Sequence, residues 1–425
     1  MRFEIIRDPL WNNIRVDPVA TRLLDTGTFQ RLRYVRQLGL AYLVYPGATH
    51  TRFEHALGTY HLARRTLALL GERDELRAVG DEECAIVRAA ALLHDVGHYP
   101  FSHALEEIGA PHHETVAQPL IVGGEVAHVV GDAIAPDAPD RILALIRGES
   151  TSPLQRLISG SLDLDKIEYL KRDAFMCGVP YGEIDVDRLL NSLVLVPDPA
   201  TGRLTIGLVE KGLSAMESLL FAKYQMYRNV YWHHAVRSAT AMYKRLVEDA
   251  LGTGALDAAS LARYTDEGIL HALGGTRPSA LLAALQERRL YKRIFESPAA
   301  EIGDGIGEWI ADDRVLTAAV EDALAREVGL EPGELLLDYP AKTKMLELDI
   351  PVRRRDGAVR QLTASGWEGA INLPKLSEEL YGSARWLRVF TVRRIDVPRA
   401  RLLAVLTAPP AELRARIEAG APLPG

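Results

Sequence analysis

The segment AALLHDVGHYPFS, residues 90–102, decides the fold, because an apolar helical run ends there in a histidine followed by an aspartate. His94 and Asp95 stand where the hydrophobic face of this helix stops, and Gly97 and Pro100 then end it. A core helix gains nothing from a carboxylate that has no partner. The pair therefore raises the question of a metal site.

Two further candidate ligands stand in segments of helical spacing. His55 lies in TRFEHALG, residues 51–58, and Asp165 lies in SLDLDKIEYLKRD, residues 161–173. Imidazole nitrogens and carboxylate oxygens together suit Mn, Fe, Co, Ni or Zn, and a carboxylate-rich variant can hold Mg. Because sequence neighbours do not face each other on a helix, one ion can use His94 and Asp95 only in the wedge between them. The fold must then bring His55 and Asp165 there from neighbouring helices.

A single histidine on an apolar helix is usually a packed or surface residue, so His55 alone is a weak signal. The segment HDVGHYPFSH, residues 94–103, and the segment PHHE, residues 111–114, add several histidines close by. A solvated helix face does not need that density. The cluster therefore favours a metal-dependent site over a structural role.

Hydrophobic periodicity predicts a mostly helical chain with two small β-hairpins. In the second hairpin, two apolar runs flank Pro-Asp-Pro-Ala-Thr-Gly. Asp17 and Pro18 are expected to begin the first helix as N-cap and first-turn proline. The expected hairpins span 2–16 and 189–208. The expected helices span 17–37, 52–70, 81–95 and about 210–251, with two more within 153–178.

The pattern of the sequence changes after Gly274 and Gly275, where strand-like segments appear between the helices. Residues 343–362 and 385–397 look like strands there, between further helices. A domain boundary is therefore expected near residue 270. It separates residues 1–270 from a smaller α+β region, residues 271–425.

Composition excludes several classes of protein. The chain has 425 residues and a net charge of -7, which argues against a protein that grips nucleic acid with its whole surface. The basic runs at 243–252 and 352–360 are thus expected to be solvated faces or contacts between subunits. Two cysteines, Cys84 and Cys177, fit a reducing compartment. Without a signal core or a long apolar span, a cytoplasmic protein with no membrane partner is expected.

The motifs RFEH, HDVGHYPFSH, HHE and DLDKIEYLKRD, taken in this order, resemble the HD-domain phosphohydrolases. Within them, the similarity is to the deoxynucleoside triphosphate triphosphohydrolase branch, which is dGTPase-like or SAM-and-HD-domain-like. The resemblance extends through YRNVYWH, residues 227–233, and covers roughly the first 250 residues. It implies an HD-domain helical core at residues 1–270, with a C-terminal region that serves oligomerisation or regulation.

The resemblance implies a role for each matching residue. Deoxynucleoside triphosphates (dNTPs) would be hydrolysed to deoxynucleoside and triphosphate, in dNTP pool homeostasis. His103 would be the general acid, supported by Glu106 within i,i+3 reach, and His98 and His113 would contact the phosphate. The implied metal ligands are His55, His94, Asp95 and Asp165. The implied substrate-binding residues are Gln37, Leu38, Arg52, Lys166, Tyr169, Asp173, Lys223 and Tyr231.

Among these, the basic residues would hold phosphates, and better-known relatives carry Arg at the position of Lys223. Asp173 and Gln37 would bind the 3′-hydroxyl, and Tyr231 would exclude a 2′-hydroxyl. Ordinary core packing is a serious competitor for Tyr169 and Tyr231. The resemblance also implies an activating nucleotide between the subunits of a dimer or tetramer, held by Asp25, Gln30 and Arg33. The alternative there is a structural ion pair between Asp25 and Arg33.

Two rival functions stay open at this point. One is an HD-domain phosphohydrolase that acts on a cyclic nucleotide, on (p)ppGpp or on nucleic-acid 3′ ends. The other is a nucleotide-sensing module with a relic of a metal site. The matches at the sugar and phosphate positions favour dNTP hydrolysis over the first, and a retained general acid argues against the second. The native metal and the preferred base stay undetermined.

Overall fold

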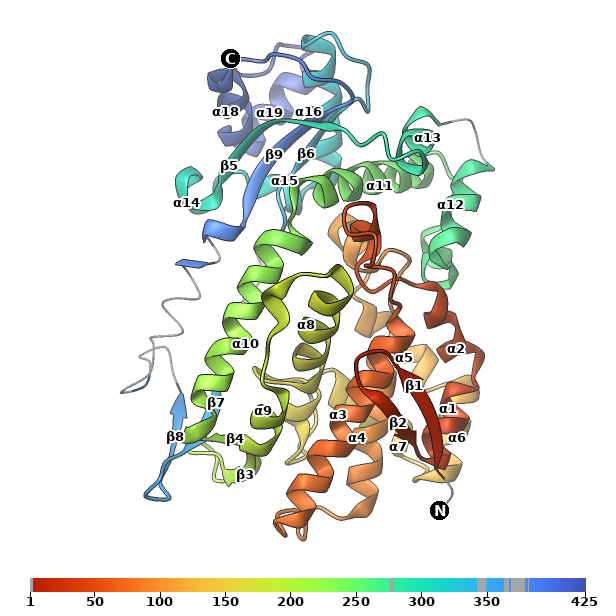
Figure 1. Ribbon diagram of the computed structural model, residues 1–425. Helices are drawn as coiled ribbons and strands as arrows, with labels where there is room; N and C mark the ends of the chain where they lie inside the picture. The colour runs from red at the N-terminus through yellow and green to blue at the C-terminus, as the bar shows by residue number, and fades with distance from the viewer. Residues whose placement is uncertain (1–2, 276–278, 342–348, 363–366, 368–378, 381) are drawn as a thin grey trace.

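The structure is a computed structural model that describes residues 3–275, 279–341, 349–362, 367, 379–380 and 382–425 (Figure 1). The chain begins with the predicted hairpin, in which β1 (Glu4–Asp8) pairs antiparallel with β2 (Asn12–Val16). Asp17 then caps α1 (Pro18–Leu24) by accepting a hydrogen bond from the Ala20 amide at 3.0 Å. This start of the first helix confirms the prediction.

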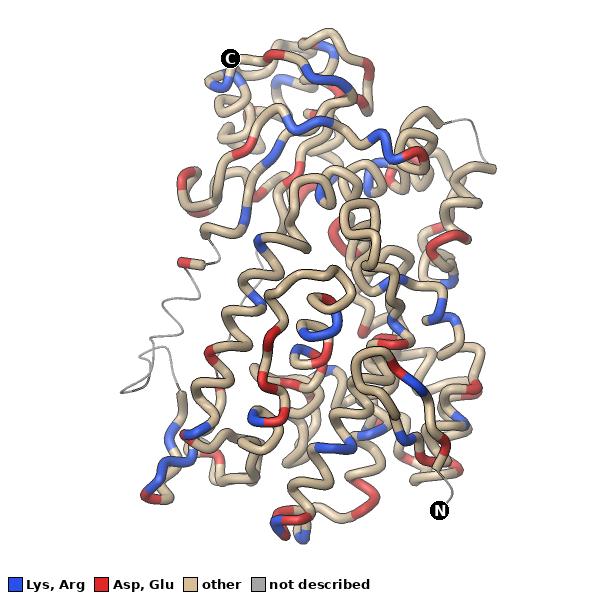
Figure 2. Tube along the Cα trace, in the orientation of Figure 1, with Lys and Arg blue, Asp and Glu red and all other residues tan. Residues whose placement is uncertain are grey.

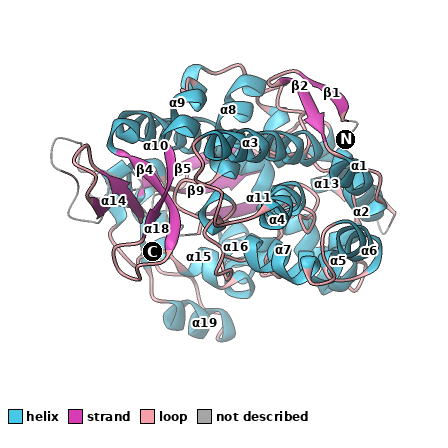
Figure 3. Ribbon diagram, turned by 90° about the horizontal axis from the view of Figure 1, so that it is seen from below, coloured by secondary structure: helices cyan, strands magenta, loops and turns pink. Residues whose placement is uncertain are grey.

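The core of the N-terminal part is built around α3 (Arg52–Glu72), which packs against α4 (Asp81–Leu93) and α8 (Leu164–Cys177). Figure 3 shows α3 between these two helices. Much of α3 and α4 is buried, as their apolar spacing predicts. The surrounding helices are α2 (Gly27–Gln30), α5 (His113–Ile121), α6 (Gly124–Ala133), α7 (Ala138–Ile146) and α9 (Val186–Ser192).

The second predicted hairpin belongs to a larger sheet. Strands β3 (Leu193–Pro197) and β4 (Leu204–Val209) pair antiparallel, and β7 (Ile350–Arg353) joins β4 in parallel. The strand β8 (Val359–Leu362) completes the order β3-β4-β7-β8. The start of the predicted strand segment, residues 343–348, lies outside the described residues. The boundary near residue 270 stays a prediction, and the chain beyond it returns to this sheet.

The prediction of one long helix from about Glu210 to Leu251 is wrong. The chain instead forms α10 (Leu213–Met226), a π-helical turn (Tyr227–Tyr231) and α11 (His234–Gly252). Figure 1 shows α10 and α11 running in different directions. Aromatic residues, which are weaker helix formers, crowd the break, whereas the apolar spacing continues across it. Periodicity alone therefore could not locate the break.

Part of the C-terminal region forms a smaller α+β lobe, whereas β7 and β8 of the same region belong to the sheet of β3 and β4. The three-stranded antiparallel sheet of this lobe has the order β5-β9-β6, and Figure 1 shows helices packed beside it. The strands are β5 (Lys292–Pro298), β6 (Leu335–Asp338) and β9 (Trp386–Thr391). Its helices are α14 (Ala299–Ile302), α15 (Trp309–Asp312), α16 (Arg314–Glu327), α18 (Arg399–Thr407) and α19 (Pro410–Glu418). The helices α12 (Asp266–Gly274) and α13 (Ala280–Gln286) pack against α11 instead.

The basic run at 243–252 is not a solvated face or a subunit contact, and that prediction is wrong. Lys244 and Arg245 are only 4% and 6% exposed. Lys244 pairs with Glu107 at 2.9 Å, and Arg245 pairs with Glu321 at 3.2 Å. Acidic partners distant in sequence therefore bury these cations inside the fold. Figure 2 shows basic and acidic residues interspersed along the whole trace.

Across the residues that the structure describes, no helix combines the length and apolar character that a membrane crossing requires.

Candidate metal and phosphohydrolase site

Three helices bring the four candidate metal ligands to one point. His55 lies on α3, His94 follows the last residue of α4, and Asp165 lies in the first turn of α8. The Nε2 atom of His55 lies 3.2 Å from Nε2 of His94 and 2.9 Å from an oxygen of Asp165. Asp95 lies 3.6 Å from His55 and 3.5 Å from His94. His55 and Asp165 therefore approach His94 and Asp95 from neighbouring helices, and the role of the four residues as metal ligands stays a prediction.

Hydrogen bonds fix how the two imidazoles are turned. Nδ1 of His55 contacts Glu168 at 2.7 Å, and Nδ1 of His94 contacts the Ala91 carbonyl at 2.9 Å. Each ring thereby presents its Nε2 atom to the cluster. A carboxylate or carbonyl behind the imidazole is the arrangement that orients metal-ligating histidines.

Glu168 was not among the predicted site residues, although it is fully buried behind His55. It accepts hydrogen bonds from the Trp11 indole at 2.8 Å and from Arg172 at 2.7 Å. Arg172 in turn contacts Asp8 in the N-terminal hairpin at 3.0 Å. The only sequence signal for Glu168 is its position three residues after Asp165, which places both on neighbouring turns of one helix.

The donor set fits a divalent ion. Ligands about 2.1 Å from an ion lie about 3 Å from one another at adjacent octahedral positions, close to the separations here. Burial raises the pKa of Asp165, but hydrogen bonds from His55 and His94 outweigh it and hold the pKa well below its ordinary value. Burial lowers the pKa of His55, but Asp165 and Glu168 raise it to about 10. The acids thus favour a positive charge at this point, whether it is a proton or a metal ion.

Two further side chains surround Asp95. Arg52 donates to Asp95 at 2.6 Å and to the Ser102 hydroxyl at 2.9 Å. Nε2 of His98 lies 3.1 Å from the other Asp95 oxygen, and His98 is only 1% exposed. Arg52 and His98, which the resemblance assigned to the phosphates, thus lie directly beside the candidate metal ligand.

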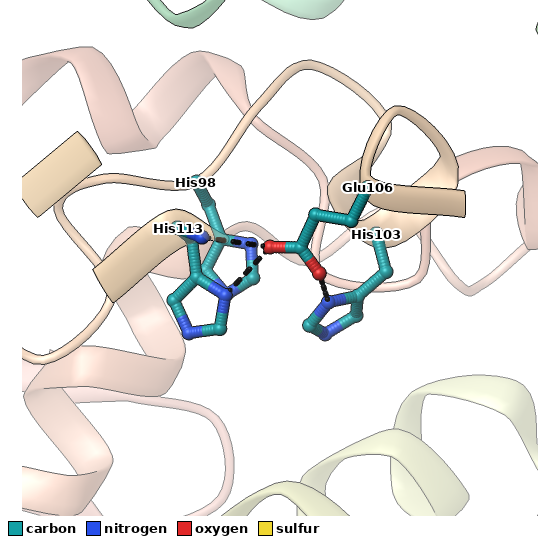
Figure 4. Close-up of side chains that lie close together, drawn as sticks. All are labelled: His98, His103, Glu106 and His113. Atoms are coloured by element: carbon teal, nitrogen blue, oxygen red, sulfur yellow. Dashed lines mark hydrogen bonds and ion pairs between the residues drawn. The ribbon is translucent and has the colours of Figure 1, made fainter. Parts of the chain in front are cut away.

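A second cluster joins His103, Glu106 and His113 (Figure 4). Glu106 lies between the two histidines, 2.8 Å from Nδ1 of His103 and 2.7 Å from Nδ1 of His113. Burial raises the pKa of Glu106, but these two contacts outweigh it and keep the group ionised. His103 is exposed, and His113 stacks on His98 with ring centroids 3.8 Å apart. The predicted i,i+3 pair of His103 and Glu106 is therefore formed, although its residues lie on two short 3-10 turns.

Lys166 and Lys223 line a pocket of about 480 Å³ between α8, α10 and the 148–161 segment. Lys166 donates to the Gly160 carbonyl at 3.0 Å and also pairs with Asp163. Burial, and to a lesser extent the charge of Lys166, lowers the pKa of Lys223 to about 8. Both amines therefore lie close together at the side of α8 next to Asp165.

The predicted sugar-binding residues form another group. Tyr231 donates to one Asp173 oxygen at 2.7 Å, and His50 contacts the other at 2.7 Å. The backbone N–H of Gln37 donates to the His50 carbonyl at 3.0 Å, while the buried side-chain Oε1 of Gln37 has no hydrogen-bond partner among the described residues. His50 was missed by sequence reasoning; its only signal is its place five residues before His55.

One face of α8 links this group to the metal ligands. Asp165, Tyr169 and Asp173 are spaced four residues apart, so they follow one another along the helix. The ring of Tyr169 lies 6.4 Å from that of His55, measured between centroids. Leu38 is half-buried against the neighbouring hydrophobic cores. One face of α8 thus carries Asp165, beside the candidate metal ligands, and two turns later Asp173, beside His50 and Tyr231.

The residues predicted to hold an activating nucleotide lie in and just after α1 and α2. Arg33 donates to the Gln30 side chain at 2.8 Å and lies over the Phe53 ring at 3.5 Å. Asp25 and Arg33 are both exposed, and in the described part of the chain they form no ion pair with each other. The alternative of a structural Asp25–Arg33 pair is therefore not what the fold forms.

Comparison with protein-family models gives two matches. Residues 52–171 match the HD domain, and residues 184–366 match the HD associated region. The first match includes all four candidate metal ligands. The second begins before the candidate phosphate-binding Lys223 and extends across the predicted boundary at residue 270.

Curated relatives match over much of the chain. An uncharacterized protein of Methanocaldococcus jannaschii is 32% identical over 361 residues, which are 84% of this chain and 73% of that protein. The uncharacterized protein YwfO of Bacillus subtilis is 35% identical over 250 residues, 58% of this chain and 56% of YwfO. Human deoxynucleoside triphosphate triphosphohydrolase SAMHD1 is 24% identical over 406 residues, 82% of this chain and 62% of the human protein. The chain thus spans a little over half the length of some relatives.

Two solved structures share the fold. A hypothetical protein from Aquifex aeolicus is 27% identical, with a TM-score of 0.70 over 92% of this chain and 97% of that one. A phosphohydrolase from Bacteroides thetaiotaomicron is 22% identical, with a TM-score of 0.72 over 92% of this chain and all of that one.

Proposed function

The chain belongs to the HD-domain phosphohydrolase family, and from this premise we propose that it hydrolyses dNTPs to deoxynucleoside and inorganic triphosphate in a metal-dependent reaction. One observation carries the proposal: the Nε2 atom of His55 lies 3.2 Å from His94, 3.6 Å from Asp95 and 2.9 Å from Asp165, so these side chains converge around it. The activity for which the human relative is named supports the choice of substrate.

The proposed ligands of the ion are His55, His94, Asp95 and Asp165. When bound, a divalent ion there supplies Lewis-acid polarisation of a phosphoryl oxygen and an activated water. The identity of the ion follows from its donors only as far as Mn, Mg, Fe, Co, Ni or Zn. Arg52, held against Asp95 and Ser102, keeps one carboxylate pointed at the cluster.

His103 is the proposed general acid. Its Nδ1 atom is held by Glu106, so Nε2 is the atom that would carry the proton to the departing 5′ oxygen. Glu106 also accepts from the backbone N–H of His113 at 2.9 Å, which ties the two histidines to one carboxylate. Because His103 is exposed, its ring can approach a bound substrate.

Charge neutralisation is the proposed role of Lys166, Lys223 and Arg52. A triphosphate carries about four negative charges, and phosphoryl transfer depends mainly on positioning and on offsetting that charge. His98 and His113, stacked beside Asp95, would complete the wall around the reacting phosphate. The paired Asp163 keeps Lys166 close to the site when no substrate is bound.

For the sugar, the proposal assigns the 3′-hydroxyl to Asp173 and Gln37. The partnerless Oε1 of Gln37 supports this, because a buried acceptor of this kind needs a donor. Tyr231, hydrogen-bonded to Asp173, would occupy the space that a 2′-hydroxyl needs. Tyr169 and Leu38 would form the apolar wall beside the sugar.

The proposal includes a homo-oligomer, a dimer or tetramer, with an activating nucleotide at Asp25, Gln30 and Arg33. The exposure of Asp25 and Arg33 supports it, since neither side chain forms an ion pair with another residue that the structure describes. Light scattering at increasing concentration, with and without added nucleotide, tests this part. A monomer that turns over dNTPs at full rate would remove it.

Product analysis tests the reaction itself. The purified protein is incubated with each dNTP and with Mn or Mg, and the products are separated by ion-exchange chromatography. Deoxynucleoside and triphosphate are expected in equal amounts. Monophosphate with pyrophosphate, or activity on cyclic nucleotides or (p)ppGpp alone, would contradict the proposal.

A further inference from the structure

The turn that carries Glu106 is anchored by the next residue. Arg237 of α11 donates to both oxygens of Glu107 from its two terminal nitrogens, at 2.8 Å each. Lys244, two turns further along α11, donates to the same carboxylate at 2.9 Å. Burial raises the pKa of Glu107, but Arg237 and Lys244 outweigh it and hold the pKa far below its ordinary value. The carboxylate is therefore ionised and bound on both oxygens.

The same two cations also reach the C-terminal lobe. Arg237 donates from Nε to Asp338 at 3.0 Å and from Nη2 at 2.5 Å, and Nζ of Lys244 lies 3.9 Å from Asp338. Asp338 is the last residue of β6 and is fully buried. These contacts form a buried cluster, which we call the α11 charge cluster: Glu107, Arg237, Lys244 and Asp338. The buried Arg388 of β9, the register partner of Asp338, lies beside it.

This cluster fixes the orientation of the 3-10 turn Glu106–Ile108, which we call the catalytic turn because it carries Glu106. In a 3-10 turn with three residues per turn, neighbouring side chains point about 120° apart. Holding Glu107 from one side therefore sets the direction of Glu106, which holds His103 and His113 on the other. A bidentate Arg–carboxylate pair fixes geometry more tightly than a single contact.

We propose that Arg237 is a positioning residue, through which β6 of the C-terminal lobe sets the placement of Glu106 and its two histidines. The catalytic consequence rests on the proposed function, whereas the structural coupling does not. The lobe would then take part in catalysis without touching the substrate.

Neighbouring ion pairs provide a matched control. Glu248 of α11 accepts a bidentate contact from Arg314 of α16, at 2.8 and 3.0 Å. This pair joins α11 to the C-terminal lobe as Arg237 does, yet it does not touch the catalytic turn. Glu248→Gln should therefore loosen the contact between the lobe and α11 without moving Glu106.

Hydrogen exchange measured by mass spectrometry tests the coupling without metal or substrate. Asp338→Asn should raise the exchange rate of residues 102–113 about tenfold, because Arg237 loses half of its counter-charge. Glu248→Gln should leave those residues as in the wild type. Unchanged exchange at 102–113 in Asp338→Asn, or an equal rise in Glu248→Gln, would overturn the proposal.

Glu107→Gln keeps the test valid if Asp338→Asn does not fold, since the side chain of Glu107 is 23% exposed. It should raise exchange at 102–113 and, because coupling is reciprocal, also in β6 at 335–338. An unchanged β6 would contradict the coupling.

The kinetic measurements on these variants use whichever substrate the wild type hydrolyses. Both cluster variants should lower kcat roughly tenfold to a hundredfold while KM changes less than about threefold, because His103 and His113 are displaced whereas Arg52, Lys166 and Lys223 keep their places around the phosphates. Glu248→Gln should keep kcat within about twofold. A loosened turn with unchanged kcat would overturn the positioning role. If no substrate is turned over, the proposed function fails while the exchange result still decides the coupling.

Discussion

Glu168 shows how one buried carboxylate can organise the site at the scale of a single residue. It accepts hydrogen bonds from the Trp11 indole and from Arg172 and contacts His55, so His55 is oriented by a group that is itself held in place. Partners of this kind set both the direction and the basicity of a ligating imidazole. The affinity of the site for its ion should therefore depend on Glu168.

Glu168→Gln should weaken divalent-metal binding by about 10- to 100-fold, because His55 loses the carboxylate behind Nδ1. Isothermal titration calorimetry with Mn measures this directly. Trp11→Phe serves as the control, since it removes one donor to Glu168 but leaves the contact with His55, and its affinity should stay near the wild type. Equal affinity in Glu168→Gln would contradict the assignment of His55 as a ligand.

The lowered pKa of Lys223 predicts that kcat/KM depends on pH. Its pKa is about 8, lowered by burial and by Lys166, so its charge is lost as the pH rises through 8. In the free enzyme, kcat/KM for a triphosphate should fall over that range. Lys223→Arg, whose guanidinium stays charged, should move the fall to higher pH. Identical pH profiles of kcat/KM for the two proteins would show that Lys223 does not bind the phosphates.

At this scale the sequence predicted residues that carry a motif and missed those that support it. His55, His94, Asp95 and Asp165 have recognisable residue types in a recognisable order. His50 and Glu168 have ordinary types for their positions, and their roles arise from contacts across 123 and 113 residues of chain. Sequence spacing holds no information on such contacts.

Between elements, the approach of α3 to α8 depends on a small residue. A Cβ atom on Gly58 would lie 1.9 Å from the Glu168 carboxylate, so no larger residue fits there without displacing it. Gly71, near the end of the same helix, would meet its nearest neighbour at 3.8 Å. Of the two glycines of α3, Gly71 therefore has room for a larger side chain and Gly58 does not.

Gly58→Ala should lower the free energy of unfolding by about 1–3 kcal/mol through overpacking and should also weaken metal binding. Gly71→Ala should be neutral or should stabilise by up to about 1 kcal/mol, because alanine is the better helix former. Urea unfolding of both variants provides the comparison. A stable Gly58→Ala with normal metal affinity would mean that Glu168 can shift without cost.

The ends of helices could be predicted where a capping residue marks them. They could not be predicted where tertiary packing alone determines the end of the helix. Asp17 and Pro18 begin α1 as expected. The break between α10 and α11 has no proline or glycine, and Tyr231 is brought to Asp173 by the π-helical turn. Because the apolar pattern runs through the break, only the packed fold determines it.

Over the whole molecule, buried charges join the C-terminal lobe to α11. Glu321 of α16 is 1% exposed, and burial raises its pKa to about 7 although Arg314 and Arg245 oppose the shift. Its ordinary pKa is 4.5. Between these values the folded protein keeps a proton that the unfolded chain releases, so the folded state loses stability as the pH rises.

The stability contribution of Glu321 should therefore fall by up to about 3 kcal/mol between pH 4.5 and 7 and then level off. The Gln side chain in Glu321→Gln cannot ionise but can still accept from the Leu337 N–H. The stability of this variant relative to the wild type should therefore increase as the pH rises. Denaturant unfolding at pH 5 and pH 8 measures the difference between the two proteins. The same difference at both pH values would show that Glu321 ionises normally.

The overall class could be predicted because the motif and the periodicity act over long stretches of chain. A helical core with small hairpins and a smaller α+β lobe is what the structure contains. The burial of Lys244 and Arg245 could not be predicted, since a basic run reads as surface until its acidic partners are known. Likewise, the pairing of β7 with β4 joins segments about 140 residues apart.

The central claim is that one divalent ion binds among His55, His94, Asp95 and Asp165. A crystal soaked in Mn and measured at the Mn absorption edge tests it most directly. We predict a single anomalous peak about 2.0–2.3 Å from the two Nε2 atoms and the two carboxylates. A peak only at His98, His103, Glu106 and His113, or none at either cluster, would contradict it.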